Sequence, residues 1–300
     1  MIYDTIIIGS GPAGFTAAIY TTRYSLKTLV IGDTLGMITE AHKVENWPGE
    51  RTIHGFNLME KIQSHAKDLG AEMAIERVNE IKKQNNLFQV TTSSNTYESK
   101  TIILALGTEK RKLGLSNEKD YLGKGLSYCA TCDGPFFKDK TVGVIGGGDA
   151  AFMAGHILSQ TSKKVYIIAR GNKFNAKPGW IEDLAKLGNV EYVMENSVTN
   201  LLGENNLERI ELNNHEPIEL QGLFVEIGSV PSDELTKQLN IDLEKDKSIV
   251  TNSDQSTNIS GVFAAGDITT NSNKFRQVIT AASEGAIAAN SAFIFIKGGQ

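Results

Sequence analysis

The stretch DTIIIGSGPAGFTAAIYTTRYSLKTLVIGD, residues 4–33, decides the fold. It reads as an apolar strand, a glycine turn, a helix of small and apolar residues, and a second apolar strand. Its turn, GSGPAG, fits the pattern G-x-G-x-x-G, in which the glycines permit the tight turn, the backbone's approach to a pyrophosphate, and close packing of the helix. The helix N-terminus adds unpaired N–H groups for the phosphates. We therefore predict a dinucleotide-binding domain; the alternative is a turn that needs glycine only for packing.

A second copy of this pattern follows at residues 140–170, KTVGVIGGGDAAFMAGHILSQTSKKVYIIAR. Its turn, GGGDAA, fits the version of the fingerprint that ends in alanine. After each copy comes a similar strand meander, at residues 71–107 and 190–228. The repeat predicts two α/β domains, each with a parallel sheet and an added antiparallel layer. Because a duplicated domain can keep its turn after losing its ligand, a packing role alone remains the alternative for the second turn.

The residue at the end of the second strand of each copy indicates the nucleotide type. An acid there would bind a ribose 2′-hydroxyl, whereas a cation suits the 2′-phosphate of NADP. The first copy has Gly32-Asp33, and the second has Ala169-Arg170. Asp33 is therefore expected at an adenosine ribose, with an exposed turn aspartate as the alternative. Arg170 favours NADP over NAD in the second copy.

Composition limits the classes of protein that fit. The chain has 300 residues and a net charge of −5, so nothing in it supports binding to nucleic acid or to an anionic membrane. The first residues carry no positively charged leader, and AFIFI, residues 292–296, is expected on one face of a terminal helix rather than in a membrane span. Two cysteines are too few for the disulfide framework of a small secreted protein. We expect a cytoplasmic location.

Both cysteines lie in one motif, CATC, residues 129–132. Such a pair could hold half of a zinc site, but the histidines are scattered, so we expect no metal. A buried inert pair would leave the shared spacing unexplained. A CxxC pair can open and close a disulfide without refolding, and its thiol pKa is often depressed, which supplies the attacking thiolate. We interpret the pair as redox-active, with Asp133 placed to move a proton; the alternative is a turn or helix-start aspartate.

Together these features predict a relay in which a reduced nicotinamide reduces a flavin, the flavin reduces Cys129–Cys132, and the dithiol reduces a partner's disulfide. At this point the sequence resembles the low-molecular-weight thioredoxin reductases, which are FAD-dependent pyridine nucleotide-disulfide oxidoreductases. The resemblance runs nearly from end to end. It is carried, in order, by GSGPAG, VENWPG, SYCATCDG, VIGGGDAA, GLFVEIGSVP, GVFAAGD and FRQVITAASEGAIAA.

The resemblance implies a fold class of α/β with two Rossmann-like three-layer (ββα) nucleotide-binding domains, the second inserted into the first. Residues 1–111 and 244–300 would form the FAD-binding domain. Residues 112–243 would form the inserted NAD(P)H-binding domain, which carries the CxxC pair. The residues expected to bind FAD are Gly9, Ser10, Gly11, Pro12, Ala13, Gly14, Gly32, Asp33, Asn46, Gly266, Asp267, Arg276, Gln277 and Val278.

The resemblance also implies roles for the cysteine motif. Cys132 would face the flavin, Cys129 would attack thioredoxin, and Asp133 would be the acid/base. The protein would be a cytoplasmic homodimer that reduces thioredoxin or a thioredoxin-like protein with electrons from NADPH. The residues expected to bind NADP are Gly146, Gly147, Gly148, Asp149, Ala150, Ala151 and Arg170.

The sequence departs from this family in two places. The family's HRRxxxR, which grips the NADPH 2′-phosphate, is replaced by residues 169–175, in which Arg170 alone remains. The family's GGQ near the flavin becomes Leu35-Gly36-Met37. NADH, ferredoxin or another flavin carrier is therefore the alternative electron donor. A function of another class, a flavin-binding sensor without turnover, would have no reason to place CATC beside an aspartate.

Overall fold

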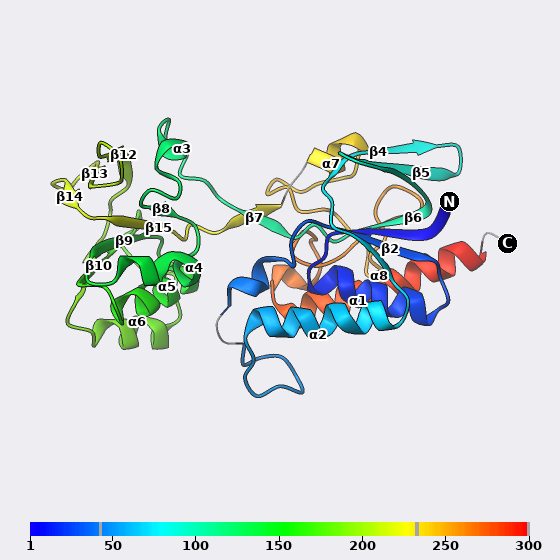
Figure 1. The fold of residues 1–300 in the computed structure, drawn as a ribbon, viewed down its shortest axis with the longest axis horizontal. Coiled ribbons are helices and arrows are strands. Elements are labelled where there is room, and N and C mark those ends of the chain that lie inside the picture. Colours follow the sequence, from blue (N-terminus) through cyan, green and yellow to red (C-terminus); the bar gives the residue numbers. More distant parts are fainter. Residues whose placement is uncertain (42–43, 232–233, 299–300) are drawn as a thin grey trace. The chain divides into compact units, whose positions relative to one another are not determined.

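The structure is a computed structural model that describes residues 1–41, 44–231 and 234–298 (Figure 1). The chain divides into two compact units. Unit 1 comprises Met1–Glu109 and Val230–Gln300, and unit 2 comprises Lys110–Ser229. The predicted fold class, two Rossmann-like domains with the second inserted into the first, is confirmed.

The predicted insertion, residues 112–243, ends later than the second unit in the structure. Unit 1 resumes at Val230. The reason is α7 (Glu234–Gln238), which packs against β4 (Val78–Gln84) of unit 1. The Gln238 side chain accepts a hydrogen bond of 2.8 Å from the Ile81 backbone N–H and donates one of 3.0 Å to the Asn79 carbonyl. These contacts are long-range, so the sequence pattern around residue 230 does not reveal them.

Unit 1 is built on a parallel sheet with the strand order β3-β2-β1-β6-β17. The strands are β1 (Ile2–Ile8), β2 (Thr28–Ile31), β3 (Glu72–Ala74), β6 (Thr96–Leu104) and β17 (Val262–Ala264). The first half of β6 also pairs antiparallel with β5 (Leu87–Thr92), which pairs with β4. The predicted meander therefore exists, and β6 belongs to both the parallel and the antiparallel part.

Side chains of β1 alternate between the two faces of this sheet, as the pleat requires. Ile7 packs among helices α1 (Pro12–Arg23), α2 (Gly55–Asp68) and α8 (Val278–Gly298), whereas Ile6 and Ile8 pack against the meander. All three isoleucines are at most 2% exposed. Helices on one face and the antiparallel strands on the other give the three-layer arrangement (Figure 1).

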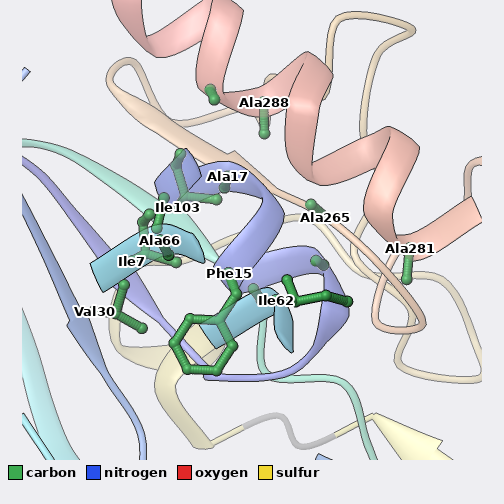
Figure 2. Packing of buried hydrophobic residues seen from close by; sticks show 14 of the residues in the cluster. Ile7, Phe15, Ala17, Val30, Ile62, Ala66, Ile103, Ala265, Ala281 and Ala288 are labelled. Atoms are coloured by element: carbon green, nitrogen blue, oxygen red, sulfur yellow. The ribbon is translucent and has the colours of Figure 1, made fainter. Parts of the chain in front are cut away.

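Helices α1 and α8 pack unusually close together. A Cβ on Gly285 of α8 would lie 2.2 Å from the carbonyl oxygen of Ala13 in α1, so the contact needs glycine. Ala17 and Ala288, both fully buried, lie in the same cluster (Figure 2). The small residues in both helices therefore serve backbone-to-backbone packing.

The terminal helix that we expected around residues 292–296 is the end of α8. Ala292 is fully buried, and Phe293 stacks on Tyr24 with ring centroids 4.7 Å apart. Among the residues that the structure describes, α8 is the one helix long and apolar enough to cross a membrane by length and composition. Buried helices of soluble proteins pass the same test, so this finding is weak evidence for a span.

Unit 2 repeats the architecture with a different chain order. Its parallel sheet has the order β11-β10-β9-β15-β8, and three further strands form a separate antiparallel sheet. The fifth parallel strand is β8, the first strand of the unit, whereas in unit 1 it is β17, the last. The strands are β8 (Leu126–Ser127), β9 (Thr141–Ile145), β10 (Lys164–Ile168), β11 (Val190–Val193), β12 (Val198–Leu202), β13 (Arg209–Leu212), β14 (Ile218–Glu219) and β15 (Gly222–Val225).

The remaining elements are short, apart from α5, which follows the second glycine turn. The helices are α3 (Glu118–Tyr121), α4 (Ala130–Asp133), α5 (Asp149–Ser159), α6 (Pro178–Ala185), and the 3-10 turns η1 (Met37–Glu40), η2 (Gly134–Phe137) and η3 (Ser272–Lys274). Two short strands, β7 (Thr108–Lys110) and β16 (Ser229–Pro231), pair with each other where the chain passes between the units.

Candidate active site

In the first glycine turn, the fold requires two of the glycines and leaves room for a side chain at the third. Gly9 has φ +116°, and its Cβ would lie 2.1 Å from the Ala105 carbonyl oxygen. A Cβ on Gly14 would lie 1.9 Å from the carbonyl oxygen of Gly9. At Gly11, by contrast, no atom of the described residues lies within 4 Å of the Cβ position. The space before the α1 N-terminus is therefore open, which fits a bound pyrophosphate.

The first turn is fastened to the loop after β2. The Ser10 hydroxyl donates to the Thr34 carbonyl, and a Cβ on Gly32 would lie 2.2 Å from Ser10 Oγ. Pro12 occupies the first turn of α1, where its missing N–H costs no helical hydrogen bond. Asp33 is exposed at the edge of this loop. The first glycine turn therefore contacts the loop after β2, which carries Asp33, the residue predicted at the ribose.

The loop after β17 and the following helix α8 bring three charged side chains together. Burial raises the pKa of the Asp267 carboxyl; Glu284 raises it further, and Arg276 opposes the shift. Arg276 Nε is buried and has no hydrogen-bond partner among the described residues. All three side chains line one pocket, together with Gly266, which has φ +85°. A half-buried carboxyl and an unpaired buried donor fit a site for a polar cofactor such as FAD.

Glu284 was missed in the sequence and proves to hold this loop in place. It is 4% exposed, and it accepts hydrogen bonds from the Gly266 N–H at 2.8 Å, the Thr269 hydroxyl at 2.8 Å and the Ser272 hydroxyl at 2.6 Å. Glu284 is the one charged residue in the apolar stretch 278–296, and this isolation is the sequence feature that indicates a buried polar role. Its role is structural support for the pocket.

Two predicted flavin-site residues far apart in sequence contact each other directly. The Asn46 amide donates to the Gln277 amide oxygen at 2.8 Å, just before α8 begins at Val278. In the same unit, Gly36 has φ +81°, and the Met37 sulfur accepts a hydrogen bond of 3.7 Å from the Thr108 hydroxyl. The structure thus brings Asn46 and Gln277 together, and their binding of the flavin stays a prediction.

The second glycine turn repeats the pattern of the first. Gly146 has φ +145°, and its Cβ would lie 2.2 Å from the Glu226 carbonyl oxygen. At Gly148, within the described part of the chain, the Cβ position has no neighbour inside 4 Å. Ala151 is fully buried in the core of unit 2, whereas Ala150 is exposed on the first turn of α5. This turn therefore keeps the open space that a pyrophosphate needs.

The segment after β10 lies over this second turn. The Gly147 carbonyl accepts hydrogen bonds from the backbone N–H groups of Asn175 at 2.7 Å and Ala176 at 3.1 Å. The Asp149 carboxylate accepts the Lys177 N–H at 2.7 Å. Arg170, the predicted 2′-phosphate ligand, is exposed at the end of β10. Gly147 and Asp149 therefore contact the segment that follows β10, and the role of Arg170 stays a prediction.

The cysteine pair forms a disulfide at the start of α4. Cys129 and Cys132 are bonded, with their Cα atoms 5.3 Å apart. Cys132 is exposed and Cys129 is half-buried. Cys129 Sγ also accepts the backbone N–H of Cys132 at 3.1 Å. Among residues 1–41, 44–231 and 234–298, no group of three metal-ligating side chains is found.

Asp133 is joined to the cysteine motif by a serine that the sequence reading missed. The Ser127 hydroxyl lies 2.6 Å from Asp133 Oδ2 and 3.0 Å from the Cys129 backbone nitrogen. Serine is common in turns and strand ends, so Ser127 has no signal of its own, although it belongs to the quoted motif SYCATCDG.

A buried carboxylate supports the residue between Ser127 and the first cysteine. Glu118 is 8% exposed and accepts the Tyr128 hydroxyl, as well as the N–H groups of Leu113 and Gly114. The Lys110 ammonium donates to the Tyr128 carbonyl. Tyr128 is therefore held at both its side chain and its backbone.

Comparison with known proteins places this architecture in a class. The family model of the pyridine nucleotide-disulphide oxidoreductases matches residues 3–285. The chain belongs to this family. The predicted redox-active cysteines and the predicted cofactors, FAD and NADPH, agree with the family.

Within that class the chain is similar to several thioredoxin reductases. The thioredoxin reductase of Treponema pallidum is 40% identical over 304 residues, which cover 98% of this chain and 97% of that protein. The structure of Lactococcus lactis thioredoxin reductase superposes with a TM-score of 0.92 at 33% identity, and 99% of each chain is covered. A ferredoxin-flavin thioredoxin reductase from Clostridium acetobutylicum gives a TM-score of 0.55 at 32% identity, with 99% of each chain covered. The chain belongs to the low-molecular-weight thioredoxin reductases, as the resemblance implied.

Proposed function

We propose that this chain is an FAD-dependent reductase that takes electrons from NADPH and passes them through Cys129–Cys132 to the disulfide of thioredoxin or a thioredoxin-like protein. The observation that carries the proposal is the Cys129–Cys132 disulfide on α4, beside Asp133, in a chain of this family. The names of the relatives support thioredoxin as the partner.

The cysteines divide the thiol chemistry between them. In the dithiol state, the Cys129 thiolate attacks a partner sulfur, forming a mixed disulfide and releasing one partner thiolate. Cys132 then attacks the Cys129 sulfur, which restores the internal disulfide and releases the second partner thiolate. The N–H of Cys132 near Cys129 Sγ supports this assignment, because such a donor stabilises a thiolate.

The predicted FAD residues would hold the cofactor in unit 1. The open space at Gly11 and the α1 N-terminus would receive the pyrophosphate, and the Asp267 pocket would receive polar groups of the cofactor. When bound, FAD supplies the two-electron chemistry that connects a nicotinamide to a disulfide.

NADPH is the donor that unit 2 favours. The Gly148 position keeps its open space, and Arg170 is available for a 2′-phosphate. Ferredoxin is the second candidate, because only one cation remains where the family has several and because a related structure is that of a ferredoxin-flavin thioredoxin reductase.

Exposed apolar side chains support binding of the two proposed protein partners, a thioredoxin-like protein and a second copy of this chain. Phe136, which is 74% exposed, lies four positions beyond Cys132 and offers a contact for the thioredoxin-like protein. Ile279, Ile287 and Ile294 are 38–59% exposed and recur at helical spacing along one face of α8. This face supports the proposed homodimer, and the cytoplasmic location remains a prediction.

The test is the colour and turnover of the purified protein. We expect the protein to carry the visible absorption bands of oxidised flavin, and NADPH to bleach them under anaerobic conditions. Catalytic amounts should then reduce thioredoxin at the expense of NADPH. Protein that folds but cannot be reconstituted with FAD would contradict the proposal, and a flavoprotein that reduces no disulfide would indicate the sensor function instead.

A further inference from the structure

We propose that Ser127 is a positioning residue, which acts through Asp133 in the proton transfer that accompanies disulfide exchange. This assignment rests on the proposed function and adds a group to its machinery. It follows from the hydrogen bonds around one hydroxyl, which joins the residue after the second cysteine to the backbone of the first.

The hydroxyl of Ser127 has one proton and three neighbours. It lies 3.0 Å from the Cys129 backbone nitrogen, 2.6 Å from Asp133 Oδ2 and 3.3 Å from the Cys129 carbonyl oxygen. The nitrogen can only donate, so the hydroxyl oxygen accepts there. Its proton goes to Asp133, because the bond to a carboxylate is shorter and stronger than one to a carbonyl.

The position of this hydroxyl is fixed by the sheet of unit 2. Ser127 is 4% exposed and ends β8, where it lies in register with Phe224 of the neighbouring strand β15. The Asp133 N–H also donates to the Cys129 carbonyl at 3.0 Å. Asp133 is therefore hydrogen-bonded within the cysteine motif through both its backbone N–H and its side-chain carboxylate.

Asp133 keeps one oxygen for proton exchange. In the described chain the Ser127 bond is the one hydrogen bond of the Asp133 side chain, and it uses Oδ2. When the dithiol is spent, it loses two electrons, and the partner disulfide gains them as two thiolates. The Cys129 thiolate has already given its proton to water. Asp133 takes the proton of Cys132 and delivers it to one departing partner thiolate, and the other partner thiolate takes a proton from water. Ser127 holds the Asp133 carboxylate in place meanwhile.

The experiment compares Ser127→Thr with Ser127→Val in the full-length holoenzyme. The two side chains have nearly the same shape and differ in whether a hydroxyl is present. The protein is reduced anaerobically with dithionite and mixed with oxidised thioredoxin, so that one turnover is followed without any nicotinamide. We expect the rate for Ser127→Val to be about tenfold or more below that for Ser127→Thr, because a charge-assisted hydrogen bond is lost.

The same pair is then measured in the Asp133→Asn background, which separates positioning from general structural damage. If Ser127 acts through Asp133, the rates of the threonine and valine variants should differ by no more than about twofold in the Asp133→Asn background. The reason is that the interaction between the two side chains is already lost in that background. Ser127→Ala should repeat the loss if valine disturbs folding. Ser99→Ala removes another fully buried serine hydroxyl, which lies in unit 1, and should leave the rate unchanged.

Two outcomes would overturn the assignment. Equal rates for the threonine and valine variants would show that the hydroxyl has no role. An equal loss with and without Asp133 would show that Ser127 supports the fold of the motif only. Wild-type holoenzyme that fails to reduce thioredoxin would instead overturn the proposed function, and the Ser127 assignment with it.

Discussion

The Asp149 carboxylate accepts a hydrogen bond of 2.7 Å from the backbone N–H of Lys177. It joins the first turn of α5 to the end of the loop that follows β10. The Lys177 ammonium also lies 3.5 Å from the same carboxylate. One of the cations near the second glycine turn therefore lies against Asp149. Arg170, exposed at the end of β10, is the cation that we expect to bind a 2′-phosphate.

Arg170→Ala should separate the two nicotinamides. Loss of one charged phosphate contact costs about 1.5–3 kcal/mol, which is roughly a 10- to 150-fold fall in kcat/KM for NADPH. The value for NADH should barely change, because its ribose carries no phosphate. Lys186→Ala is the control, because Lys186 is exposed and pairs with Asp183 in the same unit. An equal loss for both nucleotides would assign Arg170 a structural role.

Gly11→Ala and Gly14→Ala should have opposite consequences. The Gly11 position has φ −86°, and no described atom lies near its Cβ site, so the variant should fold with stability within about 1 kcal/mol of the wild type. It should lose FAD, because a methyl group would enter the space of the pyrophosphate. Gly14→Ala should destabilise the FAD-free protein by about 1–3 kcal/mol or more, since its Cβ meets backbone.

Denaturant unfolding of the FAD-free variants and FAD titration test this pair. Full FAD affinity in Gly11→Ala would contradict the assignment of the first turn.

Gly148→Ala tests the second turn in the same way. Its Cβ site is open within the described residues, so the variant should fold and keep its flavin. Bleaching of the flavin by NADPH should be lost, whereas chemical reduction by dithionite should remain. If NADPH works equally well in this variant, or if only reduced ferredoxin bleaches the wild type, the second turn does not bind the donor.

Cys129→Ser and Cys132→Ser should each abolish thioredoxin reduction, while anaerobic bleaching of the flavin by NADPH survives. In Cys129→Ser, Cys132 would remain as a thiolate beside the flavin, which predicts a long-wavelength shoulder in the absorption spectrum. A shoulder seen only in Cys132→Ser would reverse the two roles.

Asp267→Asn should stabilise the FAD-free protein at neutral pH. Burial raises the pKa of this carboxyl above its unfolded value, so its ionised form is disfavoured in the folded state. The destabilisation is absent below the unfolded pKa, near the ordinary 3.8, and fully present above the folded pKa. Thermal unfolding of the variant should therefore occur at higher temperature at pH 7 and at an unchanged temperature well below pH 3.8.

The same variant should bind FAD more weakly, because it lacks the carboxylate that the Asp267 pocket offers to polar groups of the cofactor. A lower unfolding temperature at pH 7 would show that the carboxylate supports the fold instead.

Local pattern predicted the parts of the fold that depend on neighbours in sequence. The strand–turn–helix of residues 4–33 and its copy could be read because glycine requirements such as that of Gly9 and the alternation of Ile6 and Ile7 are written in consecutive residues. The return of the chain to unit 1 could not, because it depends on Gln238 bonding to β4, more than 150 positions away.

The candidate site shows the same division. The cysteines, Asp133 and the two fingerprints stand in short motifs, so they were predicted. Ser127 and Glu284 were missed because their importance lies in which groups their side chains meet after folding. Glu284, for example, serves the turn at Gly266 from the opposite element, and a single sequence records no such pairing.

Unit 1 is built from two separate segments of the chain, and this affects folding during synthesis on the ribosome. Residues 110–229 form a continuous unit, which can fold as soon as it has emerged. Unit 1 cannot be completed at that stage, because β6 still has an unpaired edge where β17 will bind and α1 lacks the cover of α8. The nascent chain must therefore carry an unfinished edge and an apolar helix face until residues 262–298 are made. The Asp267 pocket is lined by residues of this same stretch, so the order of translation limits how early the proposed FAD site is complete.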